Sequence, residues 1–588
     1  MGPERLMGKR KDRLTRRRLL AGAAGATAAG LSLGACTSRG DRHWDLESDV
    51  VVVGSGVGAC TAALIASRNG NGVRMLEKAA EPGGTTAKSA GVLWIPNNFT
   101  LRERGIADER DACIRYMARF SYPDRYAPGA PGLGLARDEL ALLEAFYDNA
   151  APATEALMDM GALRLAEWRM FQLDRPATDY LDDVPENKVP AGRALAPVAA
   201  DGTIGLGDEL IRQLTEALSG RGVEMHLGHR VTTLVQDEQG RVLGVEAATD
   251  GGTVSVRARR ATVFATGGYA HNLSLVRRHQ PAYLYGSCAK EVSTGDFIAI
   301  AGAAGAAMGD LSGAWRTQIV LDEALVSRYL AQGVFYPPGD SMIQVNRYGR
   351  RAVDENRNYN DRTEVHAVYD PTEAEYPNQL MFMIYDQRTA ETFAGVYPLP
   401  EKPDGGVHVI RGDTLAGLGE ALDRRLAEIE NETGGLRLAA DFARNLEATV
   451  QRFNGFAVAG RDADFDRGGA AYDSEWHAVF SPRRPDSPWP PNPYPSVTMH
   501  PFRDEGPYYA IILAAGALDT NGGPLIDAGA RVLNGQGLPI PGLYGAGNCI
   551  ASPSRDAYYG AGHTLAMSLT FAYIAANSLQ ADTAVDGG

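Results

Sequence analysis

The chain has 588 residues, 44% of them hydrophobic, and a formal net charge of −14 at pH 7. This length and composition predict a globular protein of two or three domains, and the acidic balance argues against nucleic acid as a partner. Neither quantity restricts a neutral small-molecule substrate.

The first 36 residues have the pattern of a targeting segment. A basic stretch leads to Arg16 and Arg17, and an uncharged run of Ala, Gly and Leu then ends at Cys36. This pattern resembles a twin-arginine signal followed by a lipoprotein box, so we expect export of the folded protein to the periplasm or to a membrane. Cys36 is either a lipid anchor or an incidental cysteine at a simple cleavage site. No later run is long and apolar enough to span a bilayer.

A strand, a tight glycine turn and a helix are predicted next. Residues 49–53 are an apolar run with β-branched side chains, and an Ala-rich helical pattern follows the turn. Gly54 permits the turn, Gly56 lets the backbone approach a pyrophosphate, and Ala59 supplies the small third position for helix packing. Alone, this motif is weak evidence for a nucleotide site.

A carboxylate strengthens the dinucleotide interpretation. A second apolar run, residues 73–76, ends at Glu77, which can accept hydrogen bonds from both hydroxyls of an adenosine ribose. A small, hydroxyl-rich segment follows, and its N–H groups and hydroxyls can surround phosphates and the edge of a flavin, which a nicotinamide enzyme does not need. The residues of this segment that we assign to the cofactor are Gly84, Thr85, Thr86, Ser89 and Gly91.

Two later predicted strands, residues 261–268 and 542–548, close in small residues and can bring backbone close to a large flat ligand. The second of them is followed by a small-residue helix. The further residues that we assign to the cofactor are Ala265, Thr266, Gly267, Asp296, Gly547, Asn548, Thr564 and Leu565.

In this order, these segments resemble the fumarate reductase and 3-ketosteroid dehydrogenase superfamily of flavoproteins, from Asp49 to Leu579. The resemblance implies an α/β fold with a Rossmann-like FAD-binding domain made of two separated stretches, residues 47–321 and 502–580. It also implies that a catalytic domain of α+β type, residues 322–501, is inserted between them.

The resemblance also implies FAD as the cofactor. In some relatives a histidine near the Thr-Thr segment holds the flavin covalently, and no histidine occurs here between Trp44 and His226. We therefore expect noncovalent FAD. The histidines show no metal-ligand spacing, so no metal is proposed. Because no nicotinamide site is visible, the electron acceptor is expected to be a quinone or a cytochrome.

A tyrosine followed by two spaced glycines looks like the late motif of 3-ketosteroid Δ1-dehydrogenases. In that family the tyrosine hydroxyl and the second glycine's N–H hold the substrate carbonyl oxygen, and the matching residues here are Tyr558 and Gly562. Two preorganised donors, one of them near a helix start, would stabilise the negative charge that grows as the ketone becomes enolate-like.

Two other segments resemble the family's base and its helper. The stretch from Arg350 ends at Tyr359, which matches the proposed base, and Tyr180 matches the tyrosine that supports the base by hydrogen bonding. Leu181 departs from the pattern, because relatives often have a second tyrosine there. A free tyrosine has a pKa of about 10, so its pKa must fall or its proton must be relayed for it to act near neutrality.

These assignments imply Δ1-dehydrogenation of a 3-ketosteroid, in which a proton leaves C2 and a hydride passes from C1 to flavin N5. One alternative is a fumarate- or urocanate-type reductase of an unsaturated acid. It is weakened because residues 516–523 have no histidine before their glycine pair. The others are a dehydrogenase of a smaller cyclic ketone and a lipoprotein that binds a flavin or sterol without turnover.

Overall fold

The structure is a computed structural model that describes residues 42–585 apart from 171–172, 332–335, 404 and 483. The predicted targeting segment therefore lies outside the described residues. The chain divides into Met1–Trp44 and Asp45–Gly588, and everything below concerns the second unit. Within the described residues, none of the helices combines the length and the apolarity of a membrane span.

The first sheet has eight strands in the order β16-β17-β9-β1-β2-β6, with β7 and β8 added as a hairpin beside β9. From β17 to β6 the neighbours are parallel, and parallel strands need crossover connections. The strands are β1 (Leu46–Val53), β2 (Val73–Leu76), β6 (Glu224–His226), β7 (Arg230–Gln236), β8 (Val242–Thr249), β9 (Gly252–Phe264), β16 (Arg531–Leu533) and β17 (Pro539–Gly545).

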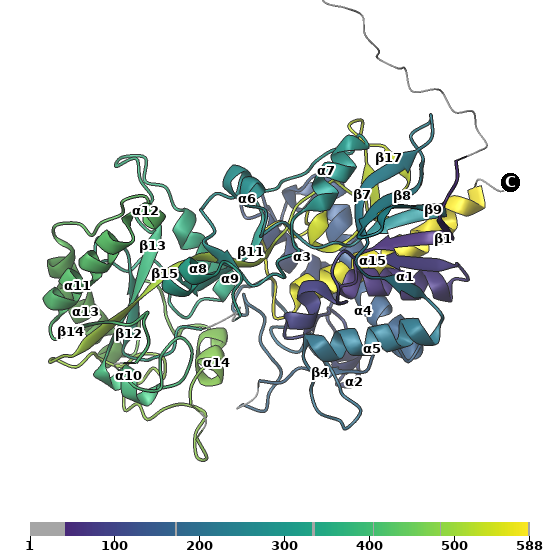
Figure 1. Cartoon of the computed structure of the whole chain (residues 1–588). Coiled ribbons are helices and arrows are strands. Elements are labelled where there is room, and N and C mark those ends of the chain that lie inside the picture. The colour runs from purple at the N-terminus through teal and green to yellow at the C-terminus, as the bar shows by residue number, and fades with distance from the viewer. Residues whose placement is uncertain (1–41, 171–172, 332–335, 404, 483, 586–588) are drawn as a thin grey trace, which may run out of the picture. The chain divides into compact units, whose positions relative to one another are not determined.

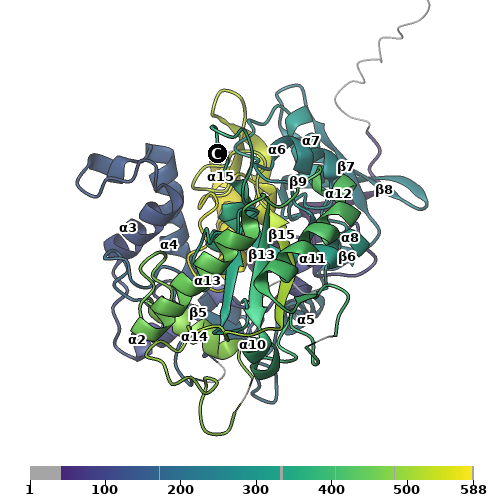
Figure 2. The same cartoon turned by 90° about the vertical axis from the view of Figure 1, so that its left-hand side faces the viewer.

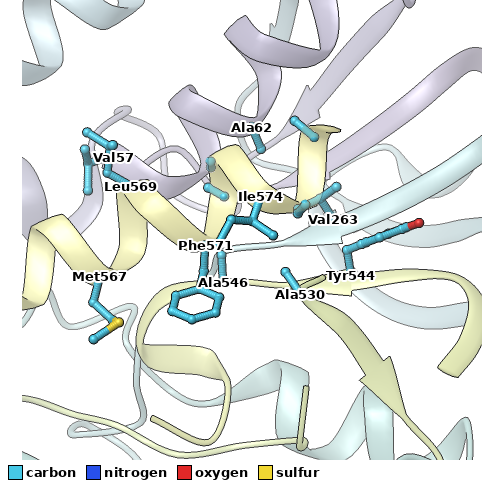
Figure 3. Packing of buried hydrophobic residues seen from close by; sticks show 14 of the residues in the cluster. Val57, Ala62, Val263, Ala530, Tyr544, Ala546, Met567, Leu569, Phe571 and Ile574 are labelled. Atoms are coloured by element: carbon cyan, nitrogen blue, oxygen red, sulfur yellow. The ribbon is translucent and has the colours of Figure 1, made fainter. Parts of the chain in front are cut away.

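Two helices cover this sheet. The helix α1 (Val57–Arg68) connects β1 to β2, and the C-terminal helix α15 (His563–Val585) packs beside it. Figure 3 shows Leu569 and Ile574 of α15 close to α1 and the sheet strands, and all of these side chains belong to one buried cluster. This packing places the C-terminal helix against the strand-turn-helix unit at the start of the described chain.

The second sheet has six strands arranged around the long strand β15. The side chains of successive residues of β13 point to opposite faces of the sheet, as they do along any β-strand. Phe382 and Ile384 pack with α11 (Leu415–Glu428) and α13 (Phe442–Ala459), which lie across one face in Figure 2. The strands are β10 (Gly286–Ser287), β11 (Ala314–Val320), β12 (Met342–Val345), β13 (Leu380–Asp386), β14 (Ile410–Gly412) and β15 (Tyr508–Thr520).

A small third sheet joins β3, β5 and β4. The remaining elements, most of which are labelled in Figure 1, are β3 (Leu93–Trp94), β4 (Leu165–Glu167), β5 (Ala194–Pro197), α2 (Phe99–Glu103), α3 (Arg110–Ser121), α4 (Arg137–Asp159), α5 (Gly207–Gly220), α6 (Leu273–His279), α7 (Asp296–Ala303), α8 (Leu321–Val326), α9 (Tyr359–Thr363), α10 (Gln387–Thr392), α12 (Glu430–Thr433) and α14 (Ala471–Val479).

The predicted α/β fold is confirmed, and the predicted helix to Arg68 and strand over 73–76 are present. The strand predicted over 261–268 ends earlier, at Phe264, so the small residues after it form a loop. The second sheet draws β10, β11 and β15 from outside residues 322–501. The boundaries of the inserted domain therefore stay a prediction.

Candidate functional site

A cavity of about 510 Å³ lies at the carboxyl edge of the parallel strands, where β1, β2 and β9 end. In open α/β sheets this edge is where ligands bind. Most residues assigned to the cofactor from the sequence line it. They are Gly54, Gly56, Glu77, Gly84, Thr85, Thr86, Ser89, Gly91, Ala265, Thr266, Gly267, Asp296, Asn548, Thr564 and Leu565.

Two of the predicted cofactor residues do not line the cavity. Ala59 is fully buried in α1, where its small side chain serves the packing of the helix. Gly547 has φ +72°, and a Cβ there would lie 2.5 Å from the hydroxyl oxygen of Ser568. Gly547 therefore allows the chain to pass close to α15 and does not face the cavity.

The residues at the end of β1 fit a dinucleotide. Gly54 has φ +111°, and a Cβ there would lie 2.3 Å from the carbonyl oxygen of Ala265, so a side chain cannot be accommodated. The N-cap of α1 is Gly56, which offers no side-chain cap. The first-turn N–H groups of α1 thus lie at the cavity, and a helix start of this kind binds a pyrophosphate.

Glu77 is placed to bind a ribose. Its carboxylate is 7% exposed, lines the cavity, and accepts hydrogen bonds from the Ser55 hydroxyl and the Ala79 N–H, both at 2.7 Å. The Ser55 hydroxyl also accepts from the N–H of Gly83 at 2.9 Å. Sequence reasoning missed Ser55, although its place between two glycines of the turn was a signal.

Asp296 stands at the start of α7 beside two cations. Arg230 donates to its carboxylate at 2.9 Å and Lys78 at 3.2 Å. Burial alone would raise the pKa of Asp296, but the hydrogen bond from Arg230 and the charge of Lys78 lower it. Its carboxylate therefore stays ionised and fixes Lys78 at the cavity.

Asp519 and Trp315 are two cavity residues that the sequence analysis did not assign. Asp519, near the end of β15, accepts from the N–H of Gly268 at 2.9 Å, and burial raises its pKa. The Trp315 indole N–H donates to the side-chain oxygen of Asn548 at 2.8 Å. Neither residue carries a local sequence signal, because each is recognised only through a partner more than 200 residues away.

Three predicted tyrosines come together at the other end of the cavity. The Tyr180 hydroxyl donates to the Tyr359 hydroxyl oxygen at 3.0 Å. The ring of Tyr558 stacks on that of Tyr180 with centroids 5.2 Å apart, and its centroid lies 5.4 Å from that of Tyr359. All three are buried and line the cavity. The structure thus unites the residues predicted as donor, base and helper.

Gly562 lies beside this cluster, directly before α15. Its φ is +89°, and a Cβ there would lie 2.3 Å from the backbone of Val92, so only glycine fits. Burial raises the pKa of Tyr558, while interactions with Tyr359, Thr564 and the Gly562 backbone lower it. Gly562 and Tyr558 both line this end of the cavity.

The resting tyrosines are protonated near neutrality. Burial raises the pKa of both Tyr180 and Tyr359 well above the ordinary value, and Tyr359 rises further because Tyr180 and Tyr558 are neighbours. A phenol of this kind donates hydrogen bonds in the resting site. Proton removal by Tyr359 therefore requires a prior loss or relay of its own proton.

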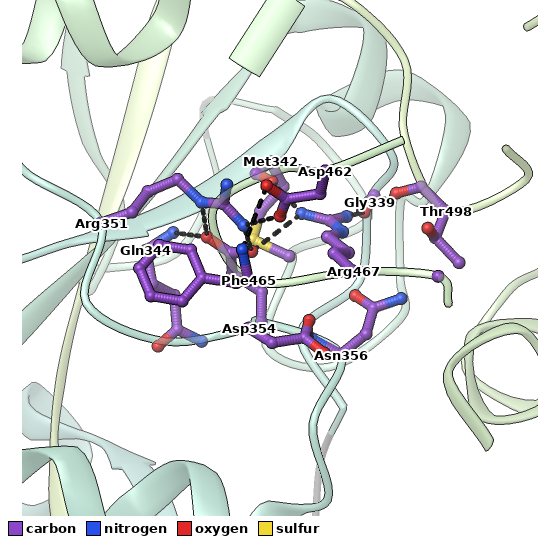
Figure 4. A network of polar contacts seen from close by, with 12 residues as sticks. Gly339, Met342, Gln344, Arg351, Asp354, Asn356, Asp462, Phe465, Arg467 and Thr498 are labelled. Atoms are coloured by element: carbon purple, nitrogen blue, oxygen red, sulfur yellow. Dashed lines mark hydrogen bonds and ion pairs between the residues drawn. The ribbon is translucent and has the colours of Figure 1, made fainter. Parts of the chain in front are cut away.

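A buried polar network fixes the segment that leads to Tyr359 (Figure 4). Arg351 contacts Glu355 and Asp462, both at 2.7 Å, and Arg467 lies 3.4 Å from Glu355. Glu355 and Arg467 are almost fully buried. Through Arg351 and Arg467, these ion pairs connect Glu355, which precedes Tyr359 by four residues, to residues 462–467, and so they restrict the backbone that leads into α9.

The tyrosine end of the cavity is aromatic and apolar. Among the described residues, the charged side chains that line the cavity are concentrated on the segments assigned to the cofactor, and none is an arginine. His563 is buried beside the tyrosines, and burial lowers its pKa to about 3, so it stays neutral. The wall consists of Val92, Trp168, Trp315, Trp476, Val479, Phe480 and Leu518.

Known proteins match this chain along nearly its whole length. The model of the FAD binding domain family matches residues 49–565. The chain is 31% identical to a 4-oxocyclohexanecarboxylate 2-dehydrogenase of Sinomonas cyclohexanicum, covering 91% of this chain and 93% of that protein. It is also 31% identical to a 3-oxosteroid 1-dehydrogenase of Mycobacterium tuberculosis, covering 90% and 98%.

A solved structure has the same fold. The crystal structure of a 3-ketosteroid Δ1-dehydrogenase from Sterolibacterium denitrificans, in complex with 1,4-androstadiene-3,17-dione, superposes with a TM-score of 0.73 at 26% identity. The match covers 91% of this chain and 99% of that one. The chain is therefore similar over its whole described body to enzymes that act on ring ketones.

Proposed function

The chain belongs to the FAD binding domain family and is an FAD-dependent oxidoreductase, and from this premise we propose that it introduces a C=C bond beside a ring ketone, with a 3-ketosteroid as first candidate substrate. The single observation that carries the proposal is the convergence of Tyr180, Tyr359, Tyr558 and Gly562 on one end of the cavity that the residues assigned to FAD also line. That end adjoins the glycine-rich segments that fit a dinucleotide.

In the proposed reaction, the Tyr558 hydroxyl and the Gly562 N–H donate hydrogen bonds to the ketone oxygen. Their donation stabilises the negative charge of the developing enolate and so acidifies the neighbouring C–H. Tyr359, after it has lost or relayed its own proton, takes the α-proton as a phenolate, and Tyr180 donates a hydrogen bond to the Tyr359 oxygen. Bound FAD supplies the acceptor for the hydride that leaves the adjacent carbon. The product is an enone.

The composition of the cavity wall supports a neutral, apolar ring system. Rings of Trp168, Trp476 and Phe480 lie along the tyrosine end, with Trp476 centred 6.2 Å from Trp168 and 6.0 Å from Phe480. Apolar ligands bind such walls by removing their surface from water. A dicarboxylate would need cations there, which weighs against the reductase of an unsaturated acid.

A second candidate substrate is a smaller cyclic ketone. The relative named 4-oxocyclohexanecarboxylate 2-dehydrogenase matches this chain at the same 31% identity as the steroid enzyme. The same polarising and proton-accepting groups could act on either ring, because each substrate has a ring ketone with a C–H on a neighbouring ring carbon. The two candidates differ in the length of apolar surface and in a carboxylate.

Anaerobic reduction of the purified yellow protein tests these proposals. 4-Androstene-3,17-dione should bleach the flavin absorbance, 4-oxocyclohexanecarboxylate should do so weakly, and fumarate with reduced viologen should give no turnover. If only 4-oxocyclohexanecarboxylate bleached the flavin, the smaller cyclic ketone would become the proposed substrate. If neither ketone reduced the flavin, the ring-ketone proposal would fail.

We also propose that the protein is exported through the twin-arginine route and held to a membrane by Cys36. This proposal rests on the sequence of residues 1–36. A location of this kind would favour a quinone or a cytochrome as electron acceptor. Stopped-flow reoxidation of the reduced protein by a short-chain quinone, set beside NAD⁺, would distinguish these acceptors from a nicotinamide.

A further inference from the structure

Asp179, the residue before Tyr180, lies in a fully buried hydrogen-bond network. Its carboxylate is 2% exposed and accepts from the Trp94 indole N–H at 2.7 Å and from the Asn187 amide at 3.1 Å. Arg193 also donates to it. With three donors, the charge of Asp179 is paired and its oxygens are satisfied, which is the condition for keeping a buried carboxylate.

The cation of this network is anchored from its other side. Arg193 is 1% exposed and makes a two-pronged contact with Asp108, at 2.8 and 2.7 Å. It also donates to the side-chain oxygen of Asn187 at 2.9 Å. A bidentate arginine pair fixes direction as well as distance, so Arg193 presents a rigid partner to Asp179.

The network contacts the glycine motif directly. The N–H of Tyr180 donates to the carbonyl oxygen of Tyr559 at 3.0 Å. A Cβ on Gly560 would lie 2.6 Å from Cδ1 of Trp94 and 3.1 Å from the Asp179 carboxylate, so the chain passes here without room for a side chain. The turn that holds Tyr180 and the loop that holds Tyr558 therefore meet at the Asp179–Trp94 hydrogen bond.

We propose that Asp179 is a positioning residue, which with Trp94 and Arg193 sets the angle between Tyr180 and Tyr558. This angle decides whether the Tyr180 hydroxyl reaches Tyr359, because the Tyr180 ring stacks on Tyr558 within 24° of parallel and its hydroxyl lies 3.0 Å from the Tyr359 hydroxyl. The kinetic part of this inference rests on the proposed function. The structural part does not.

Asp179→Asn tests the inference with little change in shape. We expect kcat on the ring ketone to fall about 10- to 100-fold, since small misplacements of catalytic groups cost this much. KM and FAD content should change little, and the rising limb of the pH profile should move to higher pH because Tyr359 loses its aligned donor.

Asp108→Asn is the matched control: it removes the other carboxylate of Arg193 but is not attached to Tyr180. An equal shift of the pH profile in both variants would overturn the assignment.

A readout without substrate separates this inference from the proposed reaction. The holoenzyme is labelled with 3-fluorotyrosine, and the ¹⁹F signals of Tyr180 and Tyr558 are assigned with the Tyr180→Phe and Tyr558→Phe variants. Asp179→Asn should move or broaden both signals, and Asp108→Asn should move them less. Unchanged signals in Asp179→Asn would sink the inference even if the enzyme oxidises ring ketones. Moved signals would support it even if the true substrate proves different.

Discussion

The hydroxyl groups of Tyr180 and Tyr359 are joined by a 3.0 Å hydrogen bond in a site where both rings are buried. Burial raises the pKa of Tyr359 well above its ordinary value. The base form of Tyr359 is the deprotonated one. As long as the pH is below the pKa, the fraction of this form grows about tenfold for each unit by which the pH rises. We therefore expect kcat/KM of the holoenzyme to rise steadily from pH 6 to alkaline pH, on the order of tenfold per unit at its steepest.

The Tyr359→Phe variant is the control for this pH dependence. It should keep FAD, lose activity by about 10²- to 10⁴-fold, and leave a residual rate that no longer rises with pH. A rate for the unchanged protein that stays flat across this range would contradict a phenolic base.

Tyr558→Phe removes one of the two donors proposed for the ketone oxygen. We expect a loss of about 10²- to 10³-fold in kcat, the usual effect of losing one donor to a developing oxyanion. The flavin content should not change, because the residues assigned to the pyrophosphate and the ribose lie on other segments. Tyr559→Phe is a neighbouring control: its hydroxyl is directed at Ser121 and not at the cavity. Normal turnover by Tyr558→Phe would disprove the donor assignment.

Glu77→Gln should weaken FAD binding and leave the chemistry of the loaded enzyme intact. The carboxylate is oriented by Ser55 and by the Ala79 N–H, and replacing a charged acceptor by a neutral one costs about 1.5–3 kcal/mol. The dissociation constant for FAD should therefore rise about 10- to 100-fold. Flavin fluorescence during titration of the apoprotein measures it. An unchanged affinity would show that Glu77 does not contact the ribose.

Local patterns predicted the parts of the cofactor site that depend on short stretches. The turn at Gly54 and Gly56 and the carboxylate of Glu77 follow one another within a single strand-turn-helix-strand unit, so spacing alone places them together. The end of β9 at Phe264 was missed, because an apolar run does not reveal where its last hydrogen bond forms.

The tyrosine cluster could not be predicted from local patterns. Tyr180 and Tyr359 are 179 residues apart, and no periodicity links two positions at that distance. The family resemblance singled them out, and the fold brings them together. Asp179 was quoted only as the neighbour of Tyr180, since the value of a buried carboxylate depends on partners such as Trp94 and Arg193 that only the folded chain brings near.

Cys36→Ala tests the proposed lipid anchor. If Cys36 carries acyl chains, its loss should move the mature protein from the membrane fraction to the soluble fraction, because stable attachment by lipid depends on the buried chains. Fractionation followed by flavin fluorescence measures the distribution, and Cys113→Ala serves as a control at a buried thiol. An unchanged distribution would remove the anchor from the proposal.

Trp476→Leu tests which ring system the cavity takes. Trp476 lines the tyrosine end and stacks on Tyr472 and Phe480. Its indole N–H has no hydrogen-bond partner among the residues that the structure describes, so its removal leaves none of their acceptors unpaired. Loss of this apolar wall should cost a polycyclic ketone about 1–2 kcal/mol of binding, or roughly a 5- to 30-fold loss in kcat/KM. A single-ring ketone that stays near the tyrosines should lose less than about threefold, since it buries less of that wall.

Measuring kcat/KM for both ketones in the variant and in the unchanged protein separates the two cases. Equal losses for the two substrates would contradict a role of Trp476 in selecting a polycyclic ring system.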